Sequence, residues 1–159
     1  MNNQNYHRSI IVNTSANHVY EALTTGYSHW WTPCDNAFHE TGDRIRFGFP
    51  PNVSYWTFEA TKLIPNKWVE LECVDAFHDI IEKPNASKTE WLGSRTIWKI
   101  KESEKLTQVD FEHVGLVPEL ACYRVCEAGW DHFFMNSLQQ YLNTGTGTPH
   151  RMISFKQTN

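Results

Sequence analysis

The polar residue best placed for chemistry is His113, which ends a run of alternating residues that starts near Leu106. Period-two spacing puts Thr107, Val109, Phe111 and His113 on one face of a strand. A neutral imidazole at the end of such a face can bind a carbonyl or hydroxyl of a ligand, or relay a proton. A histidine that satisfies nearby backbone groups is the simpler interpretation. His113 is therefore a candidate acid or base, and we assign no catalytic residue.

The four cysteines raise the question of disulfide, redox or metal chemistry. Cys122 and Cys126 are four residues apart on a predicted helix and share one face. This spacing suits a mutual disulfide poorly, because the bond requires a specific Cβ geometry. Zinc would need two further ligands, and the sequence has neither a Cys-x-x-Cys nor a His-x-x-x-His motif. We expect no metal and no other cofactor, and we expect buried thiols, with Cys73 as a further member of an inner thiol-rich patch.

Aromatic residues make up 14% of the chain and include seven tryptophans. Such side chains line cores and ligand cavities equally well. The predicted inner stripe of the last helix, which contains Cys122, Cys126, Gly129, Phe133 and Ser137, is too small and mixed to fill a wide space. Interiors are close-packed, so a gap beneath this stripe would indicate a ligand cavity. The predicted ligand-binding residues are Trp30, Trp31, Phe47, Trp56, Phe58, Cys73, Trp98, Phe111, His113, Cys122, Cys126 and Phe133. For each of them a packed core is the alternative.

A series of short strands followed by one long helix must position these residues. The sequence predicts a strand over residues 7–12, two short helices over 16–23 and 27–31, an irregular segment over 77–90 and a long helix over 119–143. Consecutive alternating strands joined by turns indicate an antiparallel sheet. We predict an α+β fold in which a curved sheet of about six strands wraps on the C-terminal helix. The strand cores are 45–49, 56–60, 69–73, 96–100 and 107–113. Trp68 and Trp91 lie outside the inward series and are expected to cover a sheet edge or mark a dimer contact.

Composition excludes several classes of partner. The net charge is −4 and no basic run occurs, so nucleic acid is not an expected partner. No apolar run approaches the roughly 20 residues of a membrane span. The N-terminus lacks the apolar core of a signal peptide, so we expect a cytoplasmic protein. We expect one domain over residues 1–159, with a loosely held tail after about residue 149.

Several motifs in order resemble a known family. They are Trp30-Trp31 after the first helix, Gly42-Asp43 before a strand, the turn Pro65-Asn66-Lys67, Gly115-Leu116 after the last strand, and Gly129-Trp130. Together they resemble the helix-grip fold of the START-like, or SRPBCC, superfamily. Within it the chain is similar to the group related to the C-terminal domain of the heat-shock-protein-ninety ATPase activator. Cys122 and Cys126 are not general features of that group.

The resemblance implies three alternative functions. In relatives, a cavity between sheet and long helix takes lipids, polyketides or other apolar molecules, so binding of a small apolar or amphipathic ligand comes first. A chaperone-activator-like interaction module comes second. A cyclase- or hydrolase-like enzyme that uses the same cavity, with His113 as acid or base, comes third, because the resemblance implies no common catalytic set. A homodimer is compatible with each.

Overall fold

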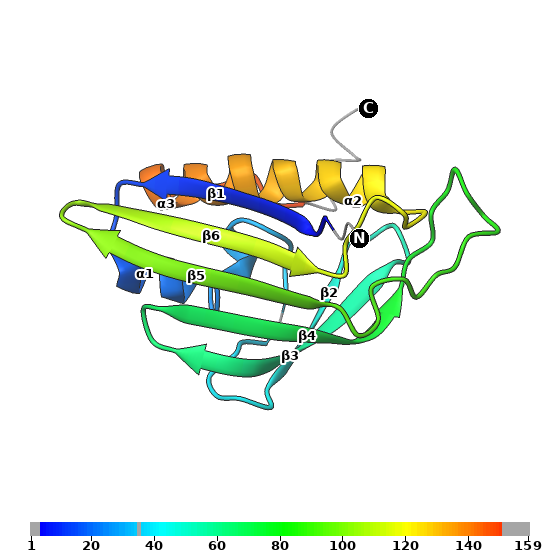
Figure 1. Ribbon diagram of the computed structural model, residues 1–159, viewed down its shortest axis with the longest axis horizontal. Coiled ribbons are helices and arrows are strands. Elements are labelled where there is room, and N and C mark those ends of the chain that lie inside the picture. The colour runs from blue at the N-terminus through cyan, green and yellow to red at the C-terminus, as the bar shows by residue number, and fades with distance from the viewer. Residues whose placement is uncertain (1–3, 35, 151–159) are drawn as a thin grey trace.

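The computed structural model of the protein describes residues 4–34 and 36–150. Its strands form one six-stranded antiparallel sheet in the order β1-β6-β5-β4-β3-β2 (Figure 1). Along the strands buried and exposed side chains alternate, as the period-two pattern predicts. The predicted α+β fold is confirmed. The strands are β1 (Tyr6–Val12), β2 (Arg44–Gly48), β3 (Tyr55–Ile64), β4 (Trp68–Phe77), β5 (Arg95–Ser103) and β6 (Leu106–Val114).

Two short helical elements follow the first strand, as the sequence predicts. The helix α1 (Ala16–Ala22) begins after Ser15, whose hydroxyl accepts a hydrogen bond from the His18 backbone N–H at 3.1 Å. The 3₁₀ turn η1 (Tyr27–His29) comes next. Trp30 is fully buried, and its indole N–H donates to the Ala22 carbonyl at 2.8 Å. This bond fixes the corner from which Trp31 enters the interior.

The C-terminal helix is continuous but changes its winding in the middle. It runs through α2 (Tyr123–Trp130), the π-helical η2 (Asp131–Leu138) and α3 (Gln139–Thr144), and lies along the sheet beside β1 (Figure 1). It ends at Gly145, whose φ of 92° is left-handed. It starts at Tyr123 rather than at residue 119. The start is set from outside the helix, because the Glu90 carboxylate accepts the backbone N–H groups of Ala121 and Cys122.

The buried row of this helix corrects the predicted stripe. Its members recur every fourth residue: Cys122, Cys126, Trp130, Phe134, Leu138 and Leu142. In a regular α-helix such a row drifts by about 40° at each step, since four residues make more than one turn of 3.6. The π-helical segment, with more residues per turn, counters this drift and keeps the row on the sheet. Gly129 and Phe133, which the sequence places in the stripe, lie half-buried beside it.

Aromatic side chains fill much of the interior. Trp98 and Phe111 stack with ring centroids 3.9 Å apart, and Phe134 packs on both. Within the described residues, no helix combines the length and apolar composition needed to cross a membrane. Except for His150, the tail predicted to be loosely held after residue 149 lies outside them.

Candidate functional site

A cavity of about 310 Å³ lies between α2 and the sheet, beside β3. Four of the seven tryptophans line it: Trp31, Trp56, Trp91 and Trp130. Their rings form a continuous wall. The ring centroid of Trp91 lies 4.9 Å from that of Trp56 and 6.0 Å from that of Trp130, to which the Trp91 ring is nearly parallel. Trp31 contacts Trp130 at 4.8 Å. Such a wall offers ring faces to an apolar molecule.

The helix side of the cavity is open because of Gly129. A Cβ built on this glycine would meet no atom within 4 Å. One turn earlier Val125, which is half exposed, lies at the edge of the cavity, and one turn later Phe133 closes its side. The absence of a side chain at Gly129 therefore leaves room that the flanking residues would otherwise take.

Two buried polar atoms in the wall lack partners. The indole N–H groups of Trp56 and Trp91 make no hydrogen bond within the described residues. A buried donor without an acceptor costs about 1–3 kcal/mol. Other polar groups of the wall are engaged: the Ser54 hydroxyl accepts from the Asp79 N–H, and His150 contacts the Pro50 carbonyl at 2.6 Å. The cavity thus offers apolar faces together with unused donors.

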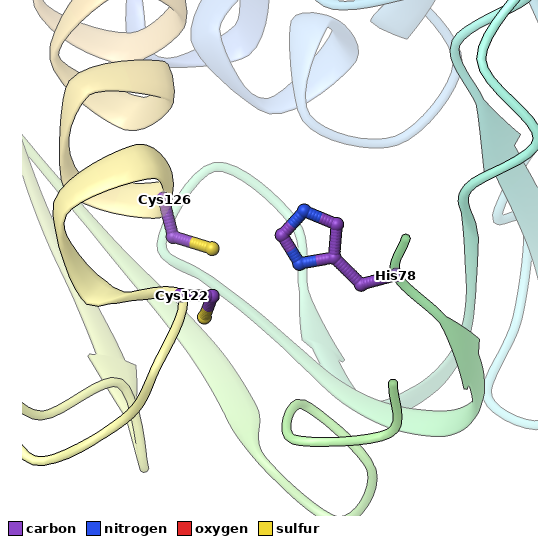
Figure 2. A group of neighbouring side chains, drawn as sticks. All are labelled: His78, Cys122 and Cys126. Carbon is purple, nitrogen blue, oxygen red and sulfur yellow. The ribbon is translucent and has the colours of Figure 1, made fainter. Parts of the chain in front are cut away.

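A histidine and two cysteines meet at one side of the cavity. The ligand-forming atoms of His78, Cys122 and Cys126 all lie within 4.8 Å of one another. In Figure 2 the His78 ring extends from the end of β4 toward the two cysteines at the start of the C-terminal helix. His78 and Cys126 also line the cavity, whereas Cys122 does not. We call these three residues the His-Cys-Cys cluster.

Hydrogen bonding within the cluster makes the pKa values of the two thiols differ. The pKa of Cys122 is lowered to about 6, chiefly by a hydrogen bond with Cys126 and also by one with His78. The pKa of Cys126 is raised because that same bond holds its proton and because the thiol is buried. The nearby Trp91 indole N–H has the opposite effect and lowers the pKa of Cys126, although its position does not meet the geometry of a hydrogen bond. Cys122 is thus the member that ionises first.

His113 is a fully engaged core residue. The Trp130 indole can only donate, and it donates to Nδ1 of His113 at 3.1 Å. Nε2 therefore carries the proton and donates to the Ser94 hydroxyl at 2.9 Å. Burial lowers the pKa of His113 to about 3, so the imidazole is neutral. His113 does not line the cavity.

The structure separates the predicted ligand-binding residues into two groups. Trp31, Trp56, Cys126 and Phe133 line the cavity. The others are buried away from its wall, and Cys122 belongs to the His-Cys-Cys cluster. These others are Trp30, Phe47, Phe58, Cys73, Trp98, Phe111 and His113.

Sequence reasoning missed several residues of the wall. Trp91 is 5% exposed and faces the interior, so its predicted place at a sheet edge or dimer contact was wrong. The turn before β5 folds it inward, since the Gly93 N–H donates to the Cys73 carbonyl and the Cys73 N–H to that of Ser94. The inward position of Trp130 could have been predicted from a four-residue period that starts at Cys122. For His78 the sequence carries no signal, because the irregular segment after β4 has no periodicity.

The chain is similar to proteins of known structure over nearly its whole length. The family model described as activator of Hsp90 ATPase homolog 1-like protein matches residues 13–143. The solution structure of the Aha1 dimer from Colwellia psychrerythraea is 28% identical, covers 91% of this chain and 99% of its own, and has a TM-score of 0.72. A search of curated proteins gave no match.

Two further structures share the fold at lower identity. A conserved protein of unknown function from Enterococcus faecalis is 17% identical, with coverage of 95% of this chain and 77% of its own and a TM-score of 0.63. The protein MLL2253 from Mesorhizobium loti is also 17% identical, with coverage of 82% and 92% and a TM-score of 0.64. The sheet, the long helix and the match over residues 13–143 lead to one conclusion. The chain belongs to the activator of Hsp90 ATPase homolog 1-like family and has the helix-grip fold of the START-like superfamily.

Proposed function

We propose that this protein binds a small apolar or amphipathic molecule in the cavity between α2 and β3. The observation that carries the proposal is the open space over Gly129 opposite the tryptophan wall. A volume of about 310 Å³ is at the lower end of the roughly 300–1,000 Å³ typical of small-molecule sites. Close packing is the rule in interiors, so an apolar space of this kind supports a binding role.

The wall indicates the chemistry of the ligand. Ring faces of Trp31, Trp91 and Trp130 favour a flat apolar body. The unpartnered N–H groups of Trp56 and Trp91 favour a hydrogen-bond acceptor on it, such as a carbonyl or carboxylate. We therefore propose a planar, mostly apolar molecule with one or two acceptor atoms.

Filling the space over Gly129 tests this proposal. Gly129→Leu places a side chain in the cavity, and Ala128→Leu places the same side chain on the exposed neighbouring position. Leucine is a better helix former than glycine, so loss of binding in Gly129→Leu would not reflect loss of the helix. We expect anilinonaphthalene sulfonate to bind the wild type and Ala128→Leu alike, and Gly129→Leu at least about tenfold more weakly, which corresponds to 1.4 kcal/mol. No uptake by the wild type, with no molecule co-purifying, would refute the proposal.

A second candidate function is supported by a different observation. The Aha1 dimer resembles this chain at 28% identity over 91% of its length. We propose as the alternative that the protein stimulates a chaperone ATPase by direct contact and forms a homodimer. An ATPase assay with purified Hsp90 from the same organism, and light scattering of the protein alone, test these two statements. No stimulation at saturating protein would exclude the alternative, and a monomeric mass would exclude the dimer.

A further inference from the structure

We propose that the His-Cys-Cys cluster is a zinc site, in which His78, Cys122 and Cys126 supply three ligands and the fourth position faces the cavity. The two thiols come from the start of the C-terminal helix, and the imidazole comes from the segment after β4 (Figure 2). Two thiolates and one imidazole form a ligand set that zinc prefers. The sequence suggested only the two cysteines, and folding adds the third ligand.

The spacing of the ligand atoms is somewhat wider than a bound zinc ion requires. Zinc bonds of about 2.3 Å to sulfur and about 2.0 Å to nitrogen place tetrahedral ligand atoms roughly 3.5–3.8 Å apart. The three atoms lie within 4.8 Å of one another before any ion is bound. An inward shift of about 1 Å or less, achieved by small side-chain rotations, completes the geometry. Cys122 and Cys126 face the same way because four residues make about one helical turn.

Backbone contacts hold each ligand in place. The His78 N–H donates to the Lys88 carbonyl at 2.8 Å, which anchors the segment that carries the imidazole. The Glu90 carboxylate accepts the Cys122 N–H at 3.0 Å and fixes the start of the helix. The Cys126 N–H donates to the Cys122 carbonyl at 2.8 Å within the helix. His78 and Cys122 are therefore held by Lys88 and Glu90, which do not belong to the cluster, and Cys126 is held by the helix itself.

The charge of the bound state balances locally. Zn²⁺ with two thiolates and a neutral imidazole is uncharged overall, and any thiol proton still present is released to solvent when the ion binds. With its three protein ligands alone the centre is neutral, which suits the apolar surroundings of Trp56 and Trp91, because burying a net charge there would be costly.

The fourth position gives the ion access to a ligand. Within the described residues no further His, Cys, Asp or Glu joins the cluster, and both His78 and Cys126 line the cavity. Sites with three protein ligands leave one position for water or an outside molecule. In this part of the inference, which rests on the proposed function, a carboxylate of the cavity ligand binds the ion. Zinc binding by the three side chains does not depend on the cavity ligand, so the metal site and the proposed ligand binding can fail separately.

Cobalt substitution tests the site directly. The full-length protein, kept reduced with a phosphine, is titrated with Co²⁺ and then with Zn²⁺. We expect one Co²⁺ per chain, intense thiolate-to-cobalt charge-transfer absorption in the near ultraviolet, and full displacement by Zn²⁺. Benzoate, a flat aromatic carboxylate, should then shift the cobalt d–d bands. Charge-transfer bands without a benzoate-induced shift would support the metal site but contradict the claim that its fourth position is open to a ligand.

Ligand variants identify the three residues. Cys122→Ser, Cys126→Ser and His78→Gln should each weaken zinc binding by more than about 10- to 100-fold, the range already seen for the loss of supporting residues around a metal. Cys34→Ser and His132→Gln, which change the same residue types outside the cluster, should bind as the wild type does. His78→Gln alters a half-buried loop residue and is the variant least expected to disturb folding, which circular dichroism checks. Absence of charge-transfer bands in the reduced wild type, or unchanged affinity in His78→Gln, would overturn the proposal.

Discussion

The two ends of the interior use the same aromatic residue types to opposite effect. At the filled end, Trp98, Phe111 and Phe134 pack against one another, and none of them lines the cavity. At the open end, the cavity wall of Trp31, Trp56, Trp91 and Trp130 faces the space over Gly129. The two ends adjoin: Trp130 of the wall packs on Phe111, and Trp91 of the wall packs on His113. Aromatic content alone therefore does not distinguish core from cavity, whereas the residue opposite the rings does.

The same contrast holds for polar groups. At the filled end the two nitrogens of His113 are both engaged, with Trp130 and Ser94. At the open end the indole N–H groups of Trp56 and Trp91 have no acceptor within the described residues. The hydrogen bonds of His113 stabilise the fold, whereas the two indole N–H groups at the open end remain able to donate to an outside acceptor. Unpartnered donors alone do not mark the open end, because the Tyr27 hydroxyl, which does not line the cavity, is also buried without a partner among the described residues; the proposed binding role depends on donors that lie beside open space.

Truncating one phenylalanine at each end should give the largest difference. Phe111→Ala removes a fully buried ring and should lower the free energy of unfolding by about 3–5 kcal/mol. Phe133→Ala removes a half-buried ring at the cavity and should cost much less, because part of that ring is already exposed. Urea unfolding of both variants measures this. Equal losses would mean that the two ends are packed alike.

Acid should destabilise the filled end through His113. Its pKa is about 3 in the folded protein, against 6.5 when exposed, so only the unfolded chain takes up a proton as the pH falls below 6.5. Stability from this group is complete above that pH and is lost at about 1.4 kcal/mol per pH unit down to about 3. Between pH 7 and pH 5 the wild type should lose about 2 kcal/mol more than His113→Gln. Parallel pH profiles in urea unfolding would contradict the burial of a neutral imidazole.

Replacing a glycine by alanine should give the smallest of these changes in stability, and its sign should differ between a crowded and an open position. A Cβ at Gly147 would lie 2.6 Å from the His29 carbonyl and 3.0 Å from that of Ser137, so Gly147→Ala should destabilise by at least about 1 kcal/mol. Gly129→Ala meets open space and should stabilise the helix by up to about 1 kcal/mol. Thermal melts of the two variants give the comparison. A destabilising Gly129→Ala would show that the space over Gly129 is already taken.

The fold could be predicted from the sequence because its signals are local. Alternation in β3 to β6 and the Ser15 cap of α1 each depend on neighbours along the chain. The helix start could not be predicted, because Glu90, 31 and 32 residues before Ala121 and Cys122, sets it. The same holds for the site. Trp91 and His78 enter it through turns and an irregular segment, where no periodicity reports which way a side chain points.

Indole resonances offer the most direct test of the central claim, that the open end binds a planar apolar acceptor. Nitrogen-15 spectra resolve tryptophan side-chain N–H groups, and naphthoate can be titrated into the labelled protein. We expect saturable shifts of the Trp56 and Trp91 indoles, whose N–H groups are unpartnered, and little change for Trp30 and Trp98, which donate to Ala22 and Thr96. Unchanged Trp56 and Trp91 signals at millimolar naphthoate, or shifts of similar size at all four, would contradict it.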